Sequence, residues 1–517
     1  MNRDNLTFVA RISVVILIGG LTALAIAACS QSSLTSTEIL EPTPTFSPVD
    51  ATATWVAFKP ERDRMTLEIL EQKSLQATVI ASTQIAMEAT VTLEATVQSP
   101  SEIGPQTTQA VLPERTIATG PINRIAYSDG KGSLFTVNPD GTERTTIGDG
   151  GSLNGEFRYT FPVWSRDGGS LSFSSYLIFE ETVSQSSLHR ADADGKGMIV
   201  TLAVDPTSQS GIGPGVPHFT TWSPNGDRIA LTTSGEFGIG SMILGSYAGE
   251  VPKSIAIGAP LYINWAPDGS AILIHQDAGL HIMTVDGNTS GSPRSIGTGS
   301  ISFNSPTWSP DSQQFAHVES INGKNSVVIT NMDEIATTVI VAEGDNRVGL
   351  GWSPDGKKIA IARSSRTSFH TLSIYNVNSG QERILHEGNI RSFWWSPDGN
   401  KLAIIEDSPA IDFAHKWSIV DVESGDLTPL VTQVTSDEFL FVQVFFDQYA
   451  DSHNLWSPDS SKIVISGTVL DLDKVVSSIG DINLPQEFDS QVWVLDANGL
   501  EDPVSVGKGT IASWSPQ

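Results

Sequence analysis

The sequence contains one cysteine, Cys29, among 517 residues. A single thiol excludes an internal disulfide, a Cys-rich zinc site and an iron–sulfur cluster. Basic residues are also scarce, because 30 Lys and Arg face 58 Asp and Glu and leave a formal net charge of −28. A surface of that sign repels DNA, which excludes a general nucleic-acid binder. Charged residues make up only 17%, while 45 Gly and 28 Pro favour short strands joined by turns.

The sequence also lacks the common catalytic motifs. It contains no G-x-S-x-G nucleophile elbow, no H-E-x-x-H zinc motif, no P-loop, and no G-x-G-x-x-G placed between a strand and a helix. We therefore expect a protein that is not an enzyme and that carries no cofactor.

The N-terminus predicts export from the cytoplasm. Residues 12–28 are almost entirely apolar, and they end in small residues directly before Cys29. This pattern resembles the lipobox of bacterial lipoproteins. The resemblance implies a signal peptide over residues 1–28, lipidation of the Cys29 sulfur, and an extracytoplasmic protein anchored to the cell membrane at the cell surface or in the periplasm. An uncleaved N-terminal anchor is the alternative, because 17 residues are at the lower limit for crossing a bilayer.

Three segments then separate the leader from the main domain. Residues 29–59 are rich in Thr and Pro, cannot bury a core, and are predicted to form a disordered linker. Residues 60–98 begin with a proline and continue without Gly or Pro, which predicts a helical stalk. Residues 99–120 form a second linker. We expect these segments to hold the following domain away from the membrane.

Residues 121–517 carry one short repeated motif, for example TWSPNG, GWSPDG and WWSPDG. The motif contains eight of the twelve tryptophans, which are spaced 43 or 44 residues apart in the middle of the domain and 58 to 61 residues apart elsewhere. A fixed period of this length indicates a repeat architecture. The motif tryptophans are Trp164, Trp222, Trp265, Trp308, Trp352, Trp395, Trp456 and Trp514.

Each repeat predicts four strands. The tryptophan ends a first strand, and Ser-Pro-Asp-Gly then forms a tight turn. A second strand follows with apolar residues seven and nine positions after the tryptophan, such as Leu402 and Ile404, so both lie on one sheet face. A third and a fourth strand complete the unit. Four antiparallel strands repeated around an axis make a β-propeller.

The two ends of the domain predict how the ring closes. Residues 124–128 and the segments after them supply second, third and fourth strands without a first one, and SWSPQ at the C-terminus supplies only a first strand. Joined, they form one blade, which protects the sheet edges. We therefore predict an all-β, eight-bladed propeller closed by its N- and C-terminal strands, with seven blades if one motif is degenerate.

The repeat WSPDGxxIA resembles the TolB-type, WD-like propeller repeat, which also occurs in propeller domains of prolyl-oligopeptidase relatives. The resemblance covers residues 121–517 and implies extracytoplasmic binding of proteins, peptides or sugars. A shared fold does not by itself determine function.

The longer repeats predict a binding surface. Their extra residues fall at 176–187, 205–220, 406–416, 433–454 and 467–490, in connections that leave a propeller on one face. Aromatic residues bordered by acids are typical of recognition surfaces. The candidate contact residues are Phe413, His415, Phe439, Phe441, Phe445, Phe446 and Tyr449. For residues 440–446, a small satellite core under a long loop is an equally good interpretation.

Polar residues at the starts of the first strands suggest a second site, a central funnel for a small ligand. These residues are His218, Tyr262, Asn304, Arg391 and His453. Asp471, Asp473 and Asp481 form a weak calcium candidate, because their loop is long and acidic. His317 takes the place of an apolar residue in its repeat and is predicted to lie in the core.

These patterns lead to three functional hypotheses. The first is a lipid-tethered, non-enzymatic propeller that binds a protein or peptide of the cell envelope. The second is a receptor for a glycan or small solute in the central funnel. The third is a metal-dependent propeller lyase or hydrolase, which requires several histidines that meet in the channel.

Overall fold

The computed structural model describes most of the predicted propeller domain. The described residues are 123–152, 156–179, 182–204, 217–235, 238–245, 252–286, 289–298, 304–335, 338–345, 347–364, 368–411, 413–471 and 489–516. They all belong to one compact unit, Met1–Ile26 with Thr116–Gln517, whereas Ala27–Arg115 form a second unit. The predicted leader, linkers and stalk lie outside the described residues.

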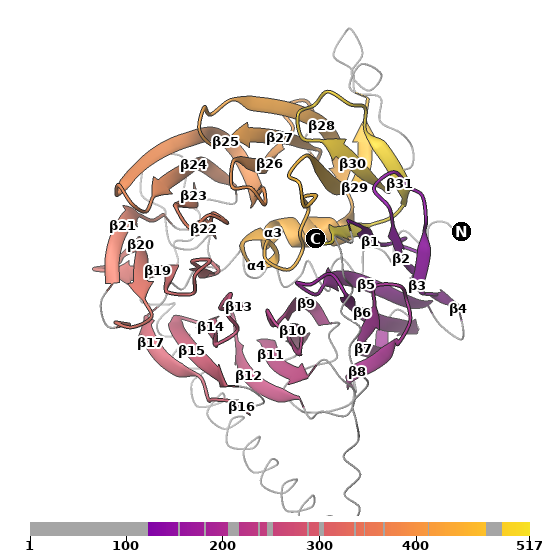
Figure 1. Ribbon diagram of the computed structural model, residues 1–517, viewed down its shortest axis with the longest axis horizontal. Helices are drawn as coiled ribbons and strands as arrows, with labels where there is room; N and C mark the ends of the chain where they lie inside the picture. Colours follow the sequence, from indigo (N-terminus) through magenta and orange to yellow (C-terminus); the bar gives the residue numbers. More distant parts are fainter. Residues whose placement is uncertain are drawn as a thin grey trace, which may run out of the picture. The chain divides into compact units, whose positions relative to one another are not determined.

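Antiparallel sheets dominate this unit and stand around a common centre (Figure 1). The first three sheets contain β1 (Ile125–Ser128), β2 (Leu134–Val137), β3 (Thr145–Gly148) and β32 (Ile511–Trp514); β4 (Gly151–Ser152), β5 (Glu156–Trp164), β6 (Ser170–Phe179), β7 (Thr182–Asp192) and β8 (Ile199–Val204); and β9 (Pro217–Trp222), β10 (Arg228–Gly235), β11 (Gly238–Gly245) and β12 (Lys253–Gly258). The protein is therefore all-β and propeller-like, as predicted.

The remaining sheets continue the same order along the chain. The next two contain β13 (Leu261–Trp265), β14 (Ala271–Gln276), β15 (Gly279–Asp286), β16 (Thr289–Ser290) and β17 (Arg294–Thr298); and β18 (Thr307–Trp308), β19 (Gln314–Ile321), β20 (Lys324–Asn331) and β21 (Thr338–Glu343). The last is a continuous sheet of β22 (Arg347–Trp352), β23 (Lys358–Ser364), β24 (Phe369–Asn376), β25 (Gln381–Trp395), β26 (Lys401–Asp407), β27 (His415–Asp421), β28 (Leu427–Thr435), β29 (Lys462–Leu470), β30 (Gln491–Asp496) and β31 (Val504–Lys508). Its length arises because β25 serves two repeats.

The first and the last strand of the domain share one sheet. β32 pairs antiparallel with β1, with Trp514 opposite Ile125 and Ile511 opposite Ser128. The sheet order is β3-β2-β1-β32, so the C-terminal strand takes the first-strand position that the N-terminal segment lacks. This pairing covers backbone groups that would otherwise form an exposed edge.

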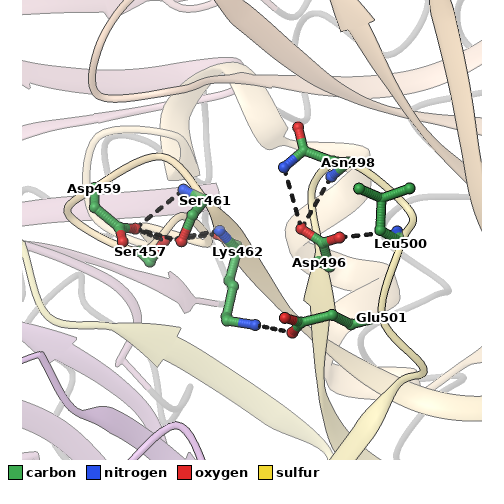
Figure 2. A network of polar contacts seen from close by, with 8 residues as sticks. All are labelled: Ser457, Asp459, Ser461, Lys462, Asp496, Asn498, Leu500 and Glu501. Atoms are coloured by element: carbon green, nitrogen blue, oxygen red, sulfur yellow. Dashed lines mark hydrogen bonds and ion pairs between the residues drawn. The ribbon is translucent and has the colours of Figure 1, made fainter.

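The repeated turn has its own hydrogen-bond pattern. In the turn after Trp395, the Ser396 hydroxyl donates to Asp398 Oδ1 at 2.6 Å and accepts from the Lys401 amide at 2.9 Å. Gly399 takes a positive φ of 70°, which glycine adopts without strain. Figure 2 shows the turn after Trp456, where Ser457 and Asp459 make the same bond and Lys462 pairs with Glu501 of the next hairpin. The motif thus specifies a side-chain-locked turn.

The motif tryptophans also link each repeat to the one before it. The Trp395 indole N–H donates to the Gly351 carbonyl, and the Trp456 indole N–H donates to the Trp394 carbonyl. The acceptor is each time the residue directly before the preceding motif tryptophan. The same bond joins Trp164 to Ser513, Trp222 to Val163 and Trp308 to Asn264. Since the Trp164 bond reaches the C-terminal strand, it crosses the junction of the two chain ends.

The predicted core positions are buried. Leu402 and Ile404 are fully buried, as are the corresponding residues of the other repeats, and His317 lies among them within hydrogen-bonding distance of Thr330. The prediction of a core histidine is therefore confirmed.

The long connections differ from the expected loops. Much of 176–187 continues β6 and β7 as a long hairpin, and 433–454 forms mainly helix. These segments satisfy their backbone groups by extending regular structure.

Candidate functional site

Two short helices occupy the centre of the ring (Figure 1). They are α3 (Asp437–Val444) and α4 (Phe446–Tyr449), and they lie in the connection between β28 and the Trp456 motif. We call residues 436–455 the plug. Ser436 precedes α3, and two acids, Asp437 and Glu438, fill its first turn, where the helix dipole favours negative charge.

The plug aromatics are buried, which corrects the prediction that they form an exposed contact surface. Phe439, Phe446 and Tyr449 are at most 1% exposed, and Phe441 and Phe445 are partly buried against the same core. The alternative interpretation, a core of their own, describes them better, although this core is continuous with that of the blades. The physical reason is that the ring leaves a central space that only large side chains fill.

Aromatic packing fixes the plug to neighbouring blades. The Phe439 ring stacks on Trp394 and Trp417, with ring centroids 6.2 and 5.9 Å apart. Phe446 packs 4.8 Å from Phe393. On strand β22, a Cβ added at Gly349 would lie 2.5 Å from the Phe446 ring, so glycine is needed for this close approach.

The predicted polar funnel is also corrected. Tyr262, Asn304 and His453 are at most 3% exposed, so they do not line an open channel. The Tyr449 hydroxyl of the plug donates to the His218 carbonyl at 2.9 Å and lies 3.0 Å from His218 Nδ1. The plug therefore covers the strand starts at which a funnel was expected.

Burial shapes the electrostatics beneath the plug. It lowers the pKa of His218 to about 4 and that of His453 to about 3, so both rings are neutral at physiological pH. Burial raises the pKa of Asp447, although nearby Arg347 opposes the shift, and Asp447 Oδ2 accepts the Ser305 amide at 2.7 Å. Arg347 also donates to the Val444 carbonyl and so ties α3 to β22.

Two other predicted site residues, Arg391 and His415, do come together. They belong to a polar row along one edge of β25–β28. Arg391 Nε donates to Asp407 Oδ1 at 2.6 Å, and His415 Nε2 lies 4.0 Å from the same oxygen. His415 Nδ1 is 2.8 Å from Thr435 Oγ1. Desolvation and the Arg391 charge lower the pKa of His415, against the effect of Asp407, so this ring is neutral at pH 7.

Exposed apolar side chains border this row. Phe413 is 49% exposed between β26 and β27, and Leu440 is 42% exposed on α3. The Gln443 side chain of α3 donates to Thr435 Oγ1 at 3.2 Å, which connects the helix to the row. We call Arg391, Asp407, Phe413, His415 and Leu440 the rim patch. It combines an exposed aromatic residue, a partly exposed arginine and acids, a composition typical of protein contacts.

A small pocket lies at the opposite end of the central space. Its walls come from the inner strands β9 and β13, the turn after Trp164, and the end of the plug. The lining residues are Arg166, Phe219, Thr221, Ile263, Asn264, Trp265, Gln448 and Asp451. Since β9 and β13 end here in their motif tryptophans, the pocket opens on the edge of the sheets that carries the Ser-Asp turns.

The part of the chain described by the structure contains no group of three His, Cys, Asp or Glu side chains close enough to hold a metal ion. Asp473 and Asp481 of the calcium candidate lie outside the described residues, and Asp471 is exposed at the end of β29. Over the same described ranges, no helix has the length and apolarity needed to span a membrane.

Sequence reasoning missed the plug and the pocket. The serine and two acids directly before an apolar run are a helix-start pattern, which could have indicated α3. Apolar residues on all sides of that run are typical of a fully buried helix. The pocket had no comparable signal, because its residues come from four separate segments.

The sheet arrangement defines a propeller-like β protein, and comparisons with known proteins are limited to weak likenesses. No protein-family model matches the sequence. An uncharacterized protein of Agrobacterium fabrum is 25% identical over 261 residues, which cover 49% of this chain and 80% of that protein. TolB from Acinetobacter baumannii has a TM-score of 0.34 at 16% identity, covering 70% of this chain and 82% of that chain. A eukaryotic initiation factor has a TM-score of 0.45 at 11% identity, covering 76% and 98%.

Proposed function

We propose that this chain is a lipid-anchored, extracytoplasmic propeller that binds a protein or peptide partner through the rim patch and has no catalytic role. The observation that carries the proposal is the rim patch itself. Phe413 and Leu440 expose apolar surface beside a charged pair, Arg391 and Asp407, on the edge of the ring where the plug enters. A buried, aromatic-filled centre supports a rigid platform, and rigid platforms lose little conformational entropy when they bind.

The architecture in this proposal is a closed ring of eight blades. The tryptophan bonds connect successive repeats, and the pairing of β32 with β1 together with the Trp164–Ser513 bond supports closure between the two chain ends. The repeats of Trp222 and Trp265 are adjacent because a Cβ at Gly269 would lie 3.5 Å from Pro224. Anchoring through Cys29 and the location outside the cytoplasm rest on the lipobox resemblance alone.

The partner proposal is tested by site-specific photocrosslinking in intact cells. A photoreactive residue at position 413 is expected to capture a defined partner, and Arg391→Glu is expected to abolish that capture. The matched control places the same residue at position 500, because Leu500 is 86% exposed between β30 and β31 on the opposite edge of the sheets. Identical products from positions 413 and 500, or no loss in Arg391→Glu, would contradict the proposal. Deleting the plug is not a suitable test, because it removes part of the core.

A further inference from the structure

The pocket beneath the plug contains two buried donors without acceptors. The Trp265 indole is 4% exposed, the Gln448 side chain is 5% exposed, and neither Trp265 Nε1 nor Gln448 Nε2 has a hydrogen-bond partner among the described residues. Both side chains line the pocket. A buried donor without an acceptor costs free energy, so two of them in one pocket point to an acceptor that is supplied from outside.

Trp265 departs from the other repeats at this point. The other seven motif indoles donate to protein oxygens, five of them to the carbonyl that precedes the neighbouring motif tryptophan. The remaining two, Trp352 and Trp514, donate to Gly356 and Asn123. The carbonyl equivalent for Trp265 belongs to Thr221, which also lines the pocket. The repeat pattern is thus broken only where the pocket lies.

Two exposed charges of opposite sign complete the lining. Arg166 and Asp451 are both exposed, and neither forms an ion pair with any described residue. Asp451 Oδ2 accepts the Asn264 amide at 2.5 Å, which orients the carboxylate and leaves its other oxygen as an acceptor. Because the pocket pairs donors with a carboxylate and the chain carries a net charge of −28, an anionic ligand is disfavoured.

We propose that this pocket binds a pair of neighbouring hydroxyl groups of a neutral saccharide. A hydroxyl group both donates and accepts, so one hydroxyl can donate to Asp451 while its oxygen accepts from Gln448. The second hydroxyl can accept from Trp265 and Arg166. Phe219 and the Trp265 ring add apolar surface for the C–H groups of a sugar. The site lies on the opposite edge of the ring from the rim patch and does not depend on it.

The test follows the Trp265 indole N–H by 15N–1H NMR, after assignment by its loss in Trp265→Phe. The probes are D-glucose, D-galactose, D-mannose and N-acetyl-D-glucosamine, with glycine as a zwitterionic probe. At least one hexose is expected to shift this resonance with a dissociation constant of about 1–10 mM. Arg166→Gln and Asp451→Asn are each expected to weaken binding about tenfold.

The control is Lys357→Gln, which removes an exposed cation from the turn after Trp352 and should leave the titration unchanged. Both test variants alter exposed residues, and unchanged positions of the other indole resonances verify that they are folded. The proposal is overturned if no hexose shifts the Trp265 signal, if the shift persists undiminished in both variants, or if glycine alone produces it.

Discussion

The repeated turns and the plug belong to the same ring, but they are built by different rules. Each turn is held by local bonds, such as those from Ser396 to Asp398 and from Lys401 to Ser396, and recurs along the chain. The plug occurs once and is held by distant contacts, such as Phe439 on Trp394 and Tyr449 on His218. Local bonds make the repeats recognisable in the sequence, whereas the plug is defined only by the space that it fills.

The two regions also treat carboxylates in opposite ways. In the turns, a hydrogen bond from Ser457 is the main cause that lowers the pKa of Asp459. In the plug, burial raises the pKa of Asp447. The turn therefore favours the ionised acid, and the plug favours the protonated acid.

The largest expected effect is the loss of the plug. Deleting residues 437–452 removes three fully buried aromatic side chains from the ring centre. Each is worth about 3–5 kcal/mol, so the sum is comparable to the total stability of a domain. We expect a chain that no longer unfolds cooperatively, as measured by calorimetry. A deletion variant with an unchanged transition would show that the ring stands without its plug.

A single cavity in the plug is expected to have the next largest effect. Phe446→Ala should lower the free energy of unfolding by about 3–5 kcal/mol, because the side chain is 1% exposed and packs on Phe393 and Phe369. Leu440→Ala is the matched control, since Leu440 is 42% exposed, and it should cost less than about 1 kcal/mol. Denaturant titration measures both, and equal losses would mean that the two residues have similar surroundings.

Substitutions in the turns test the local rule in both directions. Ser396→Ala should cost about 1 kcal/mol, because it leaves the Lys401 amide without its side-chain acceptor. The turn after Trp265 has alanine, Ala266, where other repeats have serine. Ala266→Ser should therefore stabilise by about 0.5–1 kcal/mol, since the hydroxyl can bond Asp268. A loss of stability in Ala266→Ser would show that this turn has adapted to alanine.

The smallest expected effect is the pH dependence of the two carboxylates. Because the folded pKa of Asp447 is raised, the wild type should lose stability relative to Asp447→Asn as the pH rises above about 4. The folded pKa of Asp459 is lowered, so its contribution is present above about pH 4 and is lost as the pH falls further. Unfolding curves between pH 3 and pH 7 should give differences of opposite sign for Asp447→Asn and Asp459→Asn. Differences of the same sign would contradict the comparison.

The same contrast explains which features the sequence could predict. Strand positions, buried pairs such as Leu402 and Ile404, and the opposition of Ile125 to Trp514 follow from a pattern repeated many times. Phe446 could not be placed, because a short apolar run suits a strand, a helix or a loop core equally well. Of the predicted site residues, Arg391 and His415 meet through Asp407, since neighbouring strands bring their ends to one sheet edge. Tyr262 and His453 are buried because the plug covers them.

Ring closure by the two chain ends is the claim on which the architecture depends. Its most direct test is a cysteine pair, Ala126→Cys with Ser513→Cys, in a Cys29→Ser background, because these positions are directly opposed between β1 and β32. We predict that oxidation forms an intramolecular disulfide and stabilises the domain by about 4 kcal/mol in thermal unfolding. Two thiols that stay free under oxidising conditions, in a protein that remains folded, would contradict closure.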